Sequence, residues 1–376
     1  MRPRPARLER LPAQYFTRLL ARVGDAAARD GAPLVDLGRG NPDVPPPAHV
    51  VEALATASRR PDSHGYAPFA GLAALKEAVS ARYRDVYGVT VDPEREVAVL
   101  PGSKTGLIEF AQVTTERGLP IVLPDPGYPD YRSAVAIAAA EHVPLPLDAD
   151  GRPDWDAAPA SGAAALYLNY PSNPVAACAP AGVFEEAIGW AQRTGTWVLH
   201  DFAYGDLVFG GRRPASFLAV EGAREVGLEL FSMSKSYGMA GWRLGFAVGN
   251  AELVARIEDL QNHVFAGVFT AVQEAGVVAL LGPQETVEQR RALYEARRDR
   301  ALAALQGLDA RCEGTFFVWF RLPDDMTCES LLEEQRVALA PGEGFGERGR
   351  GWARLSLAMP DDRLDLGLER LAAAFA

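Results

Sequence analysis

The sequence predicts an α/β protein with a mostly parallel main sheet, followed by a smaller α+β part at the C-terminal end. Three observations predict this class. From about residue 95, short β-branched or apolar runs alternate with helical patterns, as in βαβ units. Several of these runs end in polar or glycine-rich turns, the position where open parallel sheets bind ligands. Roughly the last ninety residues instead mix two strand patterns with helices.

The predicted strands of the main sheet are short apolar segments bounded by turn residues. In chain order they are residues 96–100, 120–124, 142–147, 164–170, 196–201, 228–233 and 245–249. Helices are predicted between them, because apolar residues recur at helical spacing over 107–114, before Gly118, and over 183–191, behind Pro180.

A long amphipathic pattern over residues 283–305 predicts a helix that connects the two parts of the chain. A strand pattern at 315–322, a helical stretch at 330–337, a second strand at 353–359 and a final helix follow. This order indicates a smaller α+β domain.

Composition favours a soluble globular protein that acts on small molecules. The chain has 376 residues, is 48% hydrophobic and 23% charged, and carries a net charge of −11. The negative charge argues against a nucleic-acid partner, and no apolar run approaches the ~18 residues of a membrane span. Three cysteines without a CxxC pair and scattered histidines predict a reducing compartment, taken as the cytoplasm, and no metal site.

Lysine is rare in this chain, and Lys235 stands out among the lysines. The chain has 38 basic residues, of which only Lys76, Lys104 and Lys235 are lysines. An amine can lose a proton when desolvated and can form a Schiff base, whereas a guanidinium stays charged. The alternative is that three lysines remain by chance in an arginine-rich chain. The residues around Lys235 must therefore distinguish a functional amine from chance.

Five turns after predicted strands could line one site: residues 101–106, 125–131, 169–174, 201–206 and 232–243. The first opens a helix with a Gly-Ser-Lys-Thr run that could bind a phosphate through backbone N–H groups and the helix dipole. Ser232 and Arg243 bracket Lys235 and could add to that phosphate site. Asp201 ends a strand, where the alternative role is a helix N-cap.

The resemblance of these motifs to one family covers nearly the whole chain. The sequence resembles the class I/II pyridoxal-phosphate aminotransferases, of fold type I, through "LGRGNPD", "GYAPFAGLAALKEAV", "PDPGYPDY", "NYPSNP", "DFAYGD", "SKSYGMAGWRLGFAVGN" and "PGEGFGERGRGWARLSLA", in family order. With its N-terminal "ARLERLPAQYF", it is most similar to the bacterial alanine and diaminopimelate aminotransferase group. The domains that this implies are an arm with part of the small domain (1–46), a large cofactor-binding domain (47–280) and a small domain (281–376).

The resemblance implies a role for each residue that faces the cofactor ring. Lys235 is the Schiff-base lysine, which also shuttles the proton of the substrate α-carbon. Asp201 pairs with the pyridinium nitrogen, Tyr204 and Asn173 hydrogen-bond the ring O3′, and Tyr128 stacks on the ring face.

The resemblance also implies how the phosphate is bound. The turn at Ser103 and Lys104, together with Ser232 and Arg243, binds it. Tyr66 reaches the phosphate from a second subunit, which implies a homodimer with shared active sites.

The substrate carboxylate is expected to lie beside Arg354. Arg354 would bind the α-carboxylate of both amino acid and 2-oxo acid as a bidentate pair, with Gly40 and Asn173 on the same side. Arg39, next to Gly40, could bind a distal carboxylate of the substrate. The alternatives are that Arg39 points to solvent or pairs with Asp43.

Two departures from the family pattern create specific expectations. Asn173-Pro174-Val175-Ala176 stands where Asn-Pro-Thr-Gly is usual, so an altered turn is expected. Gly238 replaces an asparagine, so a looser loop after Lys235 is expected. Several aromatic and polar residues are instead expected to be structural: Trp242, Phe316, Phe317, Trp319 and His200.

Three functions remain open at this point. The first is an aminotransferase that moves an amino group between an α-amino acid and a 2-oxo acid. The second is a lyase or cyclase on the same scaffold, which reaction products would distinguish. The third is a non-catalytic pyridoxal-phosphate-binding module, which the short segment before "LVDLGRGNPD" disfavours.

Overall fold

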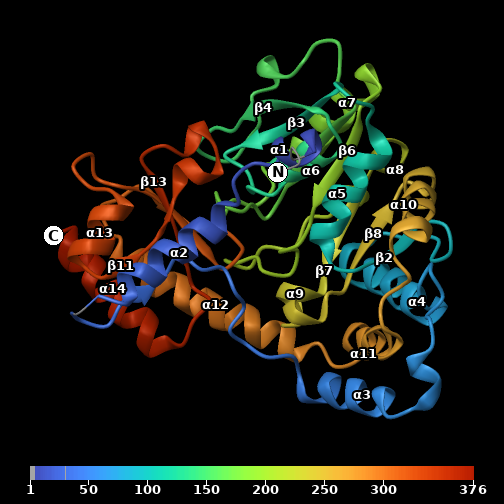
Figure 1. The fold of residues 1–376 in the computed structure, drawn as a ribbon, viewed down its shortest axis with the longest axis horizontal. Helices are drawn as coiled ribbons and strands as arrows, with labels where there is room; N and C mark the ends of the chain where they lie inside the picture. The colour runs from blue at the N-terminus through green and yellow to red at the C-terminus, as the bar shows by residue number, and fades with distance from the viewer. Residues whose placement is uncertain (1–4, 30) are drawn as a thin grey trace.

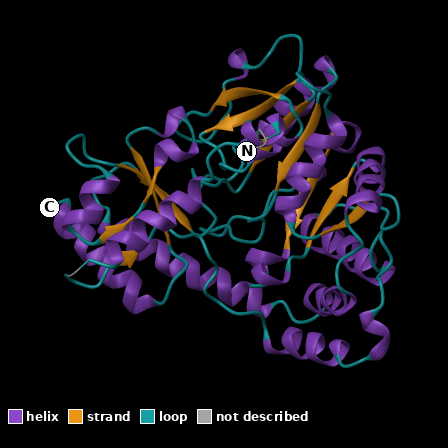
Figure 2. Ribbon diagram, in the orientation of Figure 1, coloured by secondary structure: helices purple, strands orange, loops and turns teal. Residues whose placement is uncertain are grey.

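The computed structural model describes residues 5–29 and 31–376, and its largest element is a seven-stranded sheet (Figures 1 and 2). The strand order is β2-β8-β7-β6-β5-β3-β4, and β8 alone runs antiparallel to its neighbours. The strands are β2 (Val97–Leu100), β3 (Pro120–Asp125), β4 (Glu141–Pro146), β5 (Ala165–Asn169), β6 (Trp197–Asp201), β7 (Gly227–Ser232) and β8 (Gly245–Gly249). Each coincides with a predicted segment, so the predicted fold class is confirmed.

Helices cover both faces of this sheet, because successive side chains of a strand point to opposite faces. In β2, Val97 and Val99 pack on one side, whereas Ala98 and Leu100 pack on the other. The first face contacts α4 (Ala73–Arg82), α7 (Val183–Thr194) and α11 (Thr270–Leu281), which in turn packs on α3 (Ala48–Ser58). The second face contacts α5 (Ser103–Thr114), α6 (Tyr131–Ile137) and α10 (Ala251–Val264).

A four-stranded antiparallel sheet forms the C-terminal part, in the order β12-β13-β10-β9. Its strands are β9 (Ala310–Arg311), β10 (Phe317–Arg321), β12 (Ala340–Pro341) and β13 (Trp352–Ser356), and α13 (Cys328–Glu334) and α14 (Asp361–Ala374) accompany them. The helix predicted over 330–337 is wrong at its end, because α13 stops at Glu334 and Val337 belongs to β11 (Val337–Ala338).

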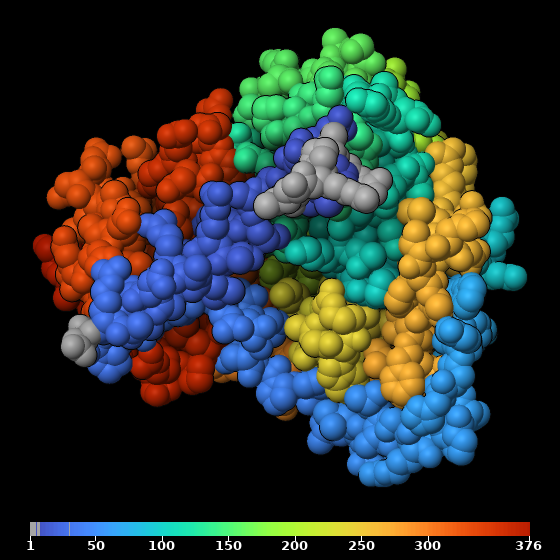
Figure 3. Space-filling view, in the orientation of Figure 1, coloured from blue at the N-terminus to red at the C-terminus, as the bar shows by residue number. Residues whose placement is uncertain are grey.

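The N-terminal segment lies with the C-terminal part of the chain. Strand β1 (Val35–Asp36) pairs in parallel with β11. Helix α2 (Tyr15–Ala27) lies across the boundary between the C-terminal part and the rest of the molecule (Figures 1 and 3). The residue limits of the domains stay a prediction.

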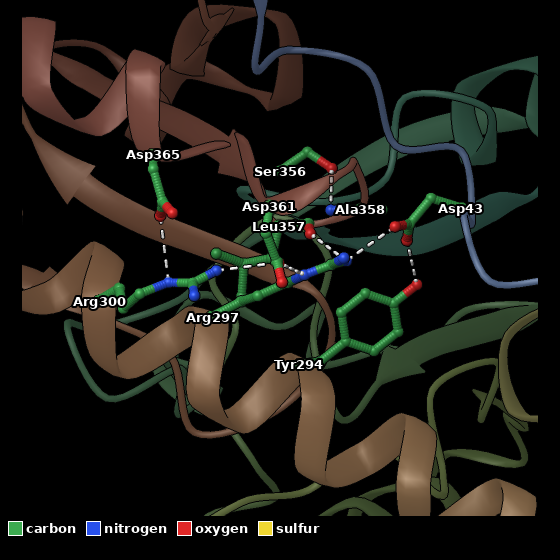
Figure 4. Close-up of polar contacts among 9 residues, drawn as sticks. All are labelled: Asp43, Tyr294, Arg297, Arg300, Ser356, Leu357, Ala358, Asp361 and Asp365. Carbon is green, nitrogen blue, oxygen red and sulfur yellow. Dashed lines mark hydrogen bonds and ion pairs between the residues drawn. The ribbon is translucent and has the colours of Figure 1, made fainter. Parts of the chain in front are cut away.

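The long connecting helix is α12 (Glu285–Ala304). Three buried polar side chains on one face of it form hydrogen bonds to neighbouring segments. Arg290, Tyr294 and Arg297 are spaced four and three residues apart, so they share that face. Arg297 donates to Asp43 (2.8 Å) and Asp361 (2.7 Å), and Tyr294 Oη also donates to Asp43 (2.9 Å), as Figure 4 shows. Helix α12 therefore fixes the segment that follows residue 40 against α14.

Arg290 makes the corresponding contacts at the other end of this face. Its guanidinium donates to the carbonyl oxygens of Pro45 (2.9 Å), Ser236 (3.3 Å) and Lys235 (3.4 Å). The turn that carries Lys235 is thereby held against the N-terminal segment. Among residues 5–29 and 31–376, none of the helices has both the length and the apolar character needed to cross a bilayer.

Candidate active site

A cavity of about 330 Å³ opens where the carboxyl ends of the main strands meet the N-terminal segment and the small sheet. Every predicted site residue except Tyr66 lines it: Gly40, Ser103, Lys104, Tyr128, Asn173, Asp201, Tyr204, Ser232, Lys235, Arg243 and Arg354. Helix α2 contributes Phe16, Leu19 and Leu20 to its wall. The turns selected from the sequence therefore do converge on one cavity.

Asp201 is the acidic group at the end of β6, and it is 7% exposed. Its Oδ2 accepts a hydrogen bond from Tyr131 Oη (2.8 Å), and its Oδ1 accepts one from the Ala203 N–H (3.3 Å). Burial raises the pKa of Asp201, and the bond from Tyr131 opposes this shift. No helix starts after Asp201, so the alternative role as a helix N-cap is wrong. Its carboxylate forms no ion pair with any described residue.

Lys235 lies in the short helix α9 (Met233–Ser236), directly after β7. Lys76 is paired with Glu258 (2.6 Å) and Lys104 with Asp130 (2.7 Å), whereas Lys235 has no carboxylate within ion-pair distance among the described residues. Burial, with help from Arg354 and Arg243, lowers the pKa of Lys235 to about 8. A substantial fraction of this amine is therefore neutral near physiological pH.

The N-terminus of α5 and Arg243 form one end of the cavity. Gly102, just before α5, has φ +88°, and a side chain there would overlap the Arg243 guanidinium. Arg243 Nη1 donates to the Ala240 carbonyl (2.8 Å), and no described carboxylate pairs with Arg243. A helix N-terminus beside an arginine without a counter-ion fits an anion such as phosphate. The Lys104 ammonium pairs with Asp130, so we expect mainly the backbone N–H of Lys104 to face that anion.

Arg354 lies in β13 and is 1% exposed. Its Nη1 donates to Asn173 Oδ1 (2.7 Å) and its Nη2 to the Gly38 carbonyl (3.1 Å), while its Nε lacks a hydrogen-bond partner. The guanidinium stacks on the Phe317 ring at 3.8 Å. Burial lowers the pKa of Arg354 to about 10. A buried cation without a carboxylate partner among the described residues could pair with an anion that enters the cavity.

The aromatic residues lie partly as expected. Phe316 and Trp319 are buried in the core, and Trp242 packs against it. Phe317 is buried in the core as expected, and it also lines the cavity, where the Arg354 guanidinium lies over its ring. Tyr66 is 88% exposed and does not line the cavity of its own chain.

The two departures from the family pattern have clear structural consequences. Ala176 takes φ +58°, so the turn keeps a left-handed residue although alanine bears a β-carbon. Gly238 has φ +70°, and a side chain there would lie 2.6 Å from the Val44 carbonyl and 2.9 Å from Arg290 Nη1. The loop after Lys235 is therefore closely packed, and the expectation of a looser loop is wrong.

The sequence analysis missed several residues that support the site. Asn169 Nδ2 donates to the Asp201 carbonyl (2.8 Å), and its Oδ1 accepts from the Asn173 N–H (2.7 Å). Asn169 and Tyr131 lie within turns that were predicted to line the site. The sequence predicted roles only for other residues of those turns, not for these two. The helical spacing of Phe16, Leu19 and Val23 in the sequence would have indicated an apolar helix face at α2.

Comparisons with known proteins agree on one family. The family model "Aminotransferase class I and II" matches residues 32–371. The chain is 44% identical over 369 residues to the L-glutamine–4-(methylsulfanyl)-2-oxobutanoate aminotransferase of Bacillus subtilis (strain 168), covering 95% of this chain and 92% of that one. It is 37% identical over 377 residues to the LL-diaminopimelate aminotransferase of Moorella thermoacetica, covering 97% and 96%. The substrate-bound structure of BacF from Bacillus subtilis superimposes with a TM-score of 0.92 at 37% identity, covering 100% and 98%.

Proposed function

Because the chain belongs to the class I and II aminotransferase family, it is a pyridoxal-phosphate-dependent aminotransferase, and we propose that the cavity around Lys235 is its active site. One observation carries this proposal. The cavity brings together the amine of Lys235, which forms no ion pair with a described residue, the buried carboxylate of Asp201 and the buried guanidinium of Arg354. The enzyme moves an amino group between an α-amino acid and a 2-oxo acid.

The residues on the ring side of the cavity fit the cofactor. When bound, pyridoxal phosphate supplies an aldehyde and an electron-accepting ring. Lys235 would hold the aldehyde carbon covalently, and Asp201 would accept a hydrogen bond from the protonated ring nitrogen. Tyr204 and Asn173 would hydrogen-bond the ring hydroxyl, and Tyr128 would contact the ring face.

The residues at the α5 end fit the phosphate. The N–H groups of Ser103 and Lys104, the Ser232 hydroxyl and the Arg243 guanidinium would donate to it. The position of Arg243 beside Gly102 at the start of α5, with no acidic partner among the described residues, supports this role.

Lys235 and Arg354 would then act on different parts of the substrate. Arg354 would hold the α-carboxylate with Asn173 beside it, which places the α-hydrogen near the Lys235 amine. An amine with a pKa of about 8 can both accept and return a proton near neutral pH. Apolar residues of α2, including Phe16 and Leu19, would exclude water from that proton transfer.

The lyase or cyclase alternative is not favoured, because the family and the relatives compared above are aminotransferases. A panel of amino donors with a 2-oxo acid acceptor tests the assignment. We expect equal amounts of a new 2-oxo acid and a newly aminated acceptor. Ammonia released together with pyruvate would instead indicate elimination.

Arg354→Met should lower kcat/KM for every amino donor while the cofactor stays bound. The loss of a buried charge pair with the α-carboxylate corresponds to about 3 kcal/mol, or roughly 100-fold. Steady-state kinetics with alanine and glutamate measure this, and Arg321→Met, at an exposed position of β10, is the control. Normal kinetics in Arg354→Met would show that another group binds the α-carboxylate.

We propose that the enzyme is a homodimer with shared sites, in which Tyr66 of each protomer reaches the phosphate end of its partner's cavity. Exposed apolar side chains support this: Tyr66 and Phe69 lie in one loop, Val264 ends α10, and Phe269, just before α11, has its ring 5.9 Å from that of His64. Light scattering should give twice the mass of one chain. A monomer with full activity would contradict the shared site.

We also propose a cytoplasmic location. The three cysteines, Cys178, Cys312 and Cys328, are free thiols, which supports a reducing compartment.

A further inference from the structure

The cavity contains one cationic side chain more than the proposed chemistry uses. Arg243 is assigned to the phosphate, Lys235 to the aldehyde and Arg354 to the α-carboxylate, and Lys104 is neutralised by Asp130 (2.7 Å). The remaining cation on the wall is Arg39.

No carboxylate among the described residues forms an ion pair with Arg39, although its charge acts on the nearby Asp36. Asp43, the partner suggested by the sequence, is engaged elsewhere: Arg297 Nη1 contacts its Oδ2 (2.8 Å) and Tyr294 Oη donates to its Oδ1 (2.9 Å), as Figure 4 shows. Arg297 is itself 5% exposed, so Asp43 is held in a buried network and is not available to Arg39.

Asp36 is the acidic residue of the cavity wall closest to Arg39 in sequence. Its Oδ1 accepts a hydrogen bond from the Gly38 N–H (3.0 Å), and no ion pair joins its carboxylate to the Arg39 guanidinium. The charge of Arg39 opposes the rise that burial causes in the pKa of Asp36, but the Arg39 guanidinium donates no hydrogen bond to Asp36 or to another described residue.

Arg39 and Arg354 both line the cavity, and the Gly40 backbone next to Arg39 lies close to Arg354. A β-carbon on Gly40 would lie 3.6 Å from Arg354 Nη2, and Arg39 is the next residue along the chain. The wall between α2 and this segment is aliphatic, with Leu19 and Leu20. Arg39 is an exposed residue of the cavity wall and Arg354 is a buried one, so a ligand with two carboxylates joined by methylene groups could meet one cation with each carboxylate.

We propose that Arg39 binds the side-chain carboxylate of an acidic amino donor, of the aspartate or glutamate class, while Arg354 binds its α-carboxylate. The inference rests on the proposed function, because it needs Arg354 to orient the α-carboxylate. Arg39 is then a specificity residue, and the buried Asp43–Arg297–Tyr294 network keeps its loop in place.

The test compares glutamate with glutamine, which has nearly the same shape but no side-chain charge. In Arg39→Leu, the ratio of kcat/KM for glutamate to that for glutamine should fall on the order of 10- to 100-fold, as for a lost hydrogen bond to a charged group. Arg39→Lys keeps the charge and should restore most of the ratio. Arg321→Leu, an exposed arginine outside the cavity, should leave the ratio as in the wild type.

Binding of glutarate to the holoenzyme gives a readout that does not depend on turnover. Calorimetry should show weaker glutarate binding in Arg39→Leu, with butyrate binding affected less. An equal loss for glutamate and glutamine, or an unchanged ratio in Arg39→Leu, would overturn the inference and leave the transaminase assignment intact. A wild-type enzyme that transaminates no donor would overturn both.

Discussion

Replacing Lys235 with alanine should lower turnover on the order of 10⁶-fold, as for the loss of a residue that is both nucleophile and base. No other lysine can substitute, because Lys76 and Lys104 are already paired with Glu258 and Asp130. The lowered pKa of Lys235 comes from its burial in the cavity, which disfavours the charged form of the amine.

Borohydride reduction followed by peptide mapping gives the decisive measurement. The wild-type enzyme should carry a phosphopyridoxyl label on the peptide that contains Lys235, and Lys235→Ala should carry none. Lys76→Arg, which preserves the ion pair with Glu258, is the control and should keep the label on Lys235. A label on Lys76 or Lys104 would contradict the assignment.

The main sheet could be predicted almost in full from the sequence, because its strands are buried on both faces. Such strands appear as continuous apolar runs, such as Ile121–Leu123 in β3, and each is bounded by turn residues. The pairing of Val35 with Val337 could not be predicted, because strands of two residues have no periodicity and depend on distant partners. For the same reason Val337 was assigned to a helix.

The site residues were predictable where a strand end fixes their place. Asp201 and Lys235 follow neighbouring strands, β6 and β7, so their convergence follows from the topology. The double role of Phe317 was not predictable, because a buried strand residue has the same pattern whether it contacts the core or a cavity. Whether Arg39 pairs with Asp43 could not be predicted, because the partners of Asp43 come from α12, some 250 residues away in the chain.

Asp201→Asn should keep the cofactor but slow proton removal from the donor's α-carbon by roughly 10³-fold. Asparagine has the size of aspartate, its Oδ1 can still accept from the Ala203 N–H, and its Nδ2 can donate to Tyr131 Oη, so the fold around β6 should persist. It carries no charge, however, and cannot favour a protonated ring nitrogen. Single-turnover rates with α-deuterated and ordinary alanine measure this step, and the absorbance of the bound cofactor measures occupancy.

Tyr131→Phe separates the charge of Asp201 from its hydrogen bond. It removes only the 2.8 Å bond to Asp201 Oδ2, so we expect a loss of about tenfold, as for one hydrogen bond to a charged group. The carboxylate would remain and would continue to pair with the ring. A purely structural Asp201 would give the opposite pattern, in which Asp201→Asn lowers the melting temperature and leaves the isotope-sensitive step near the wild-type rate.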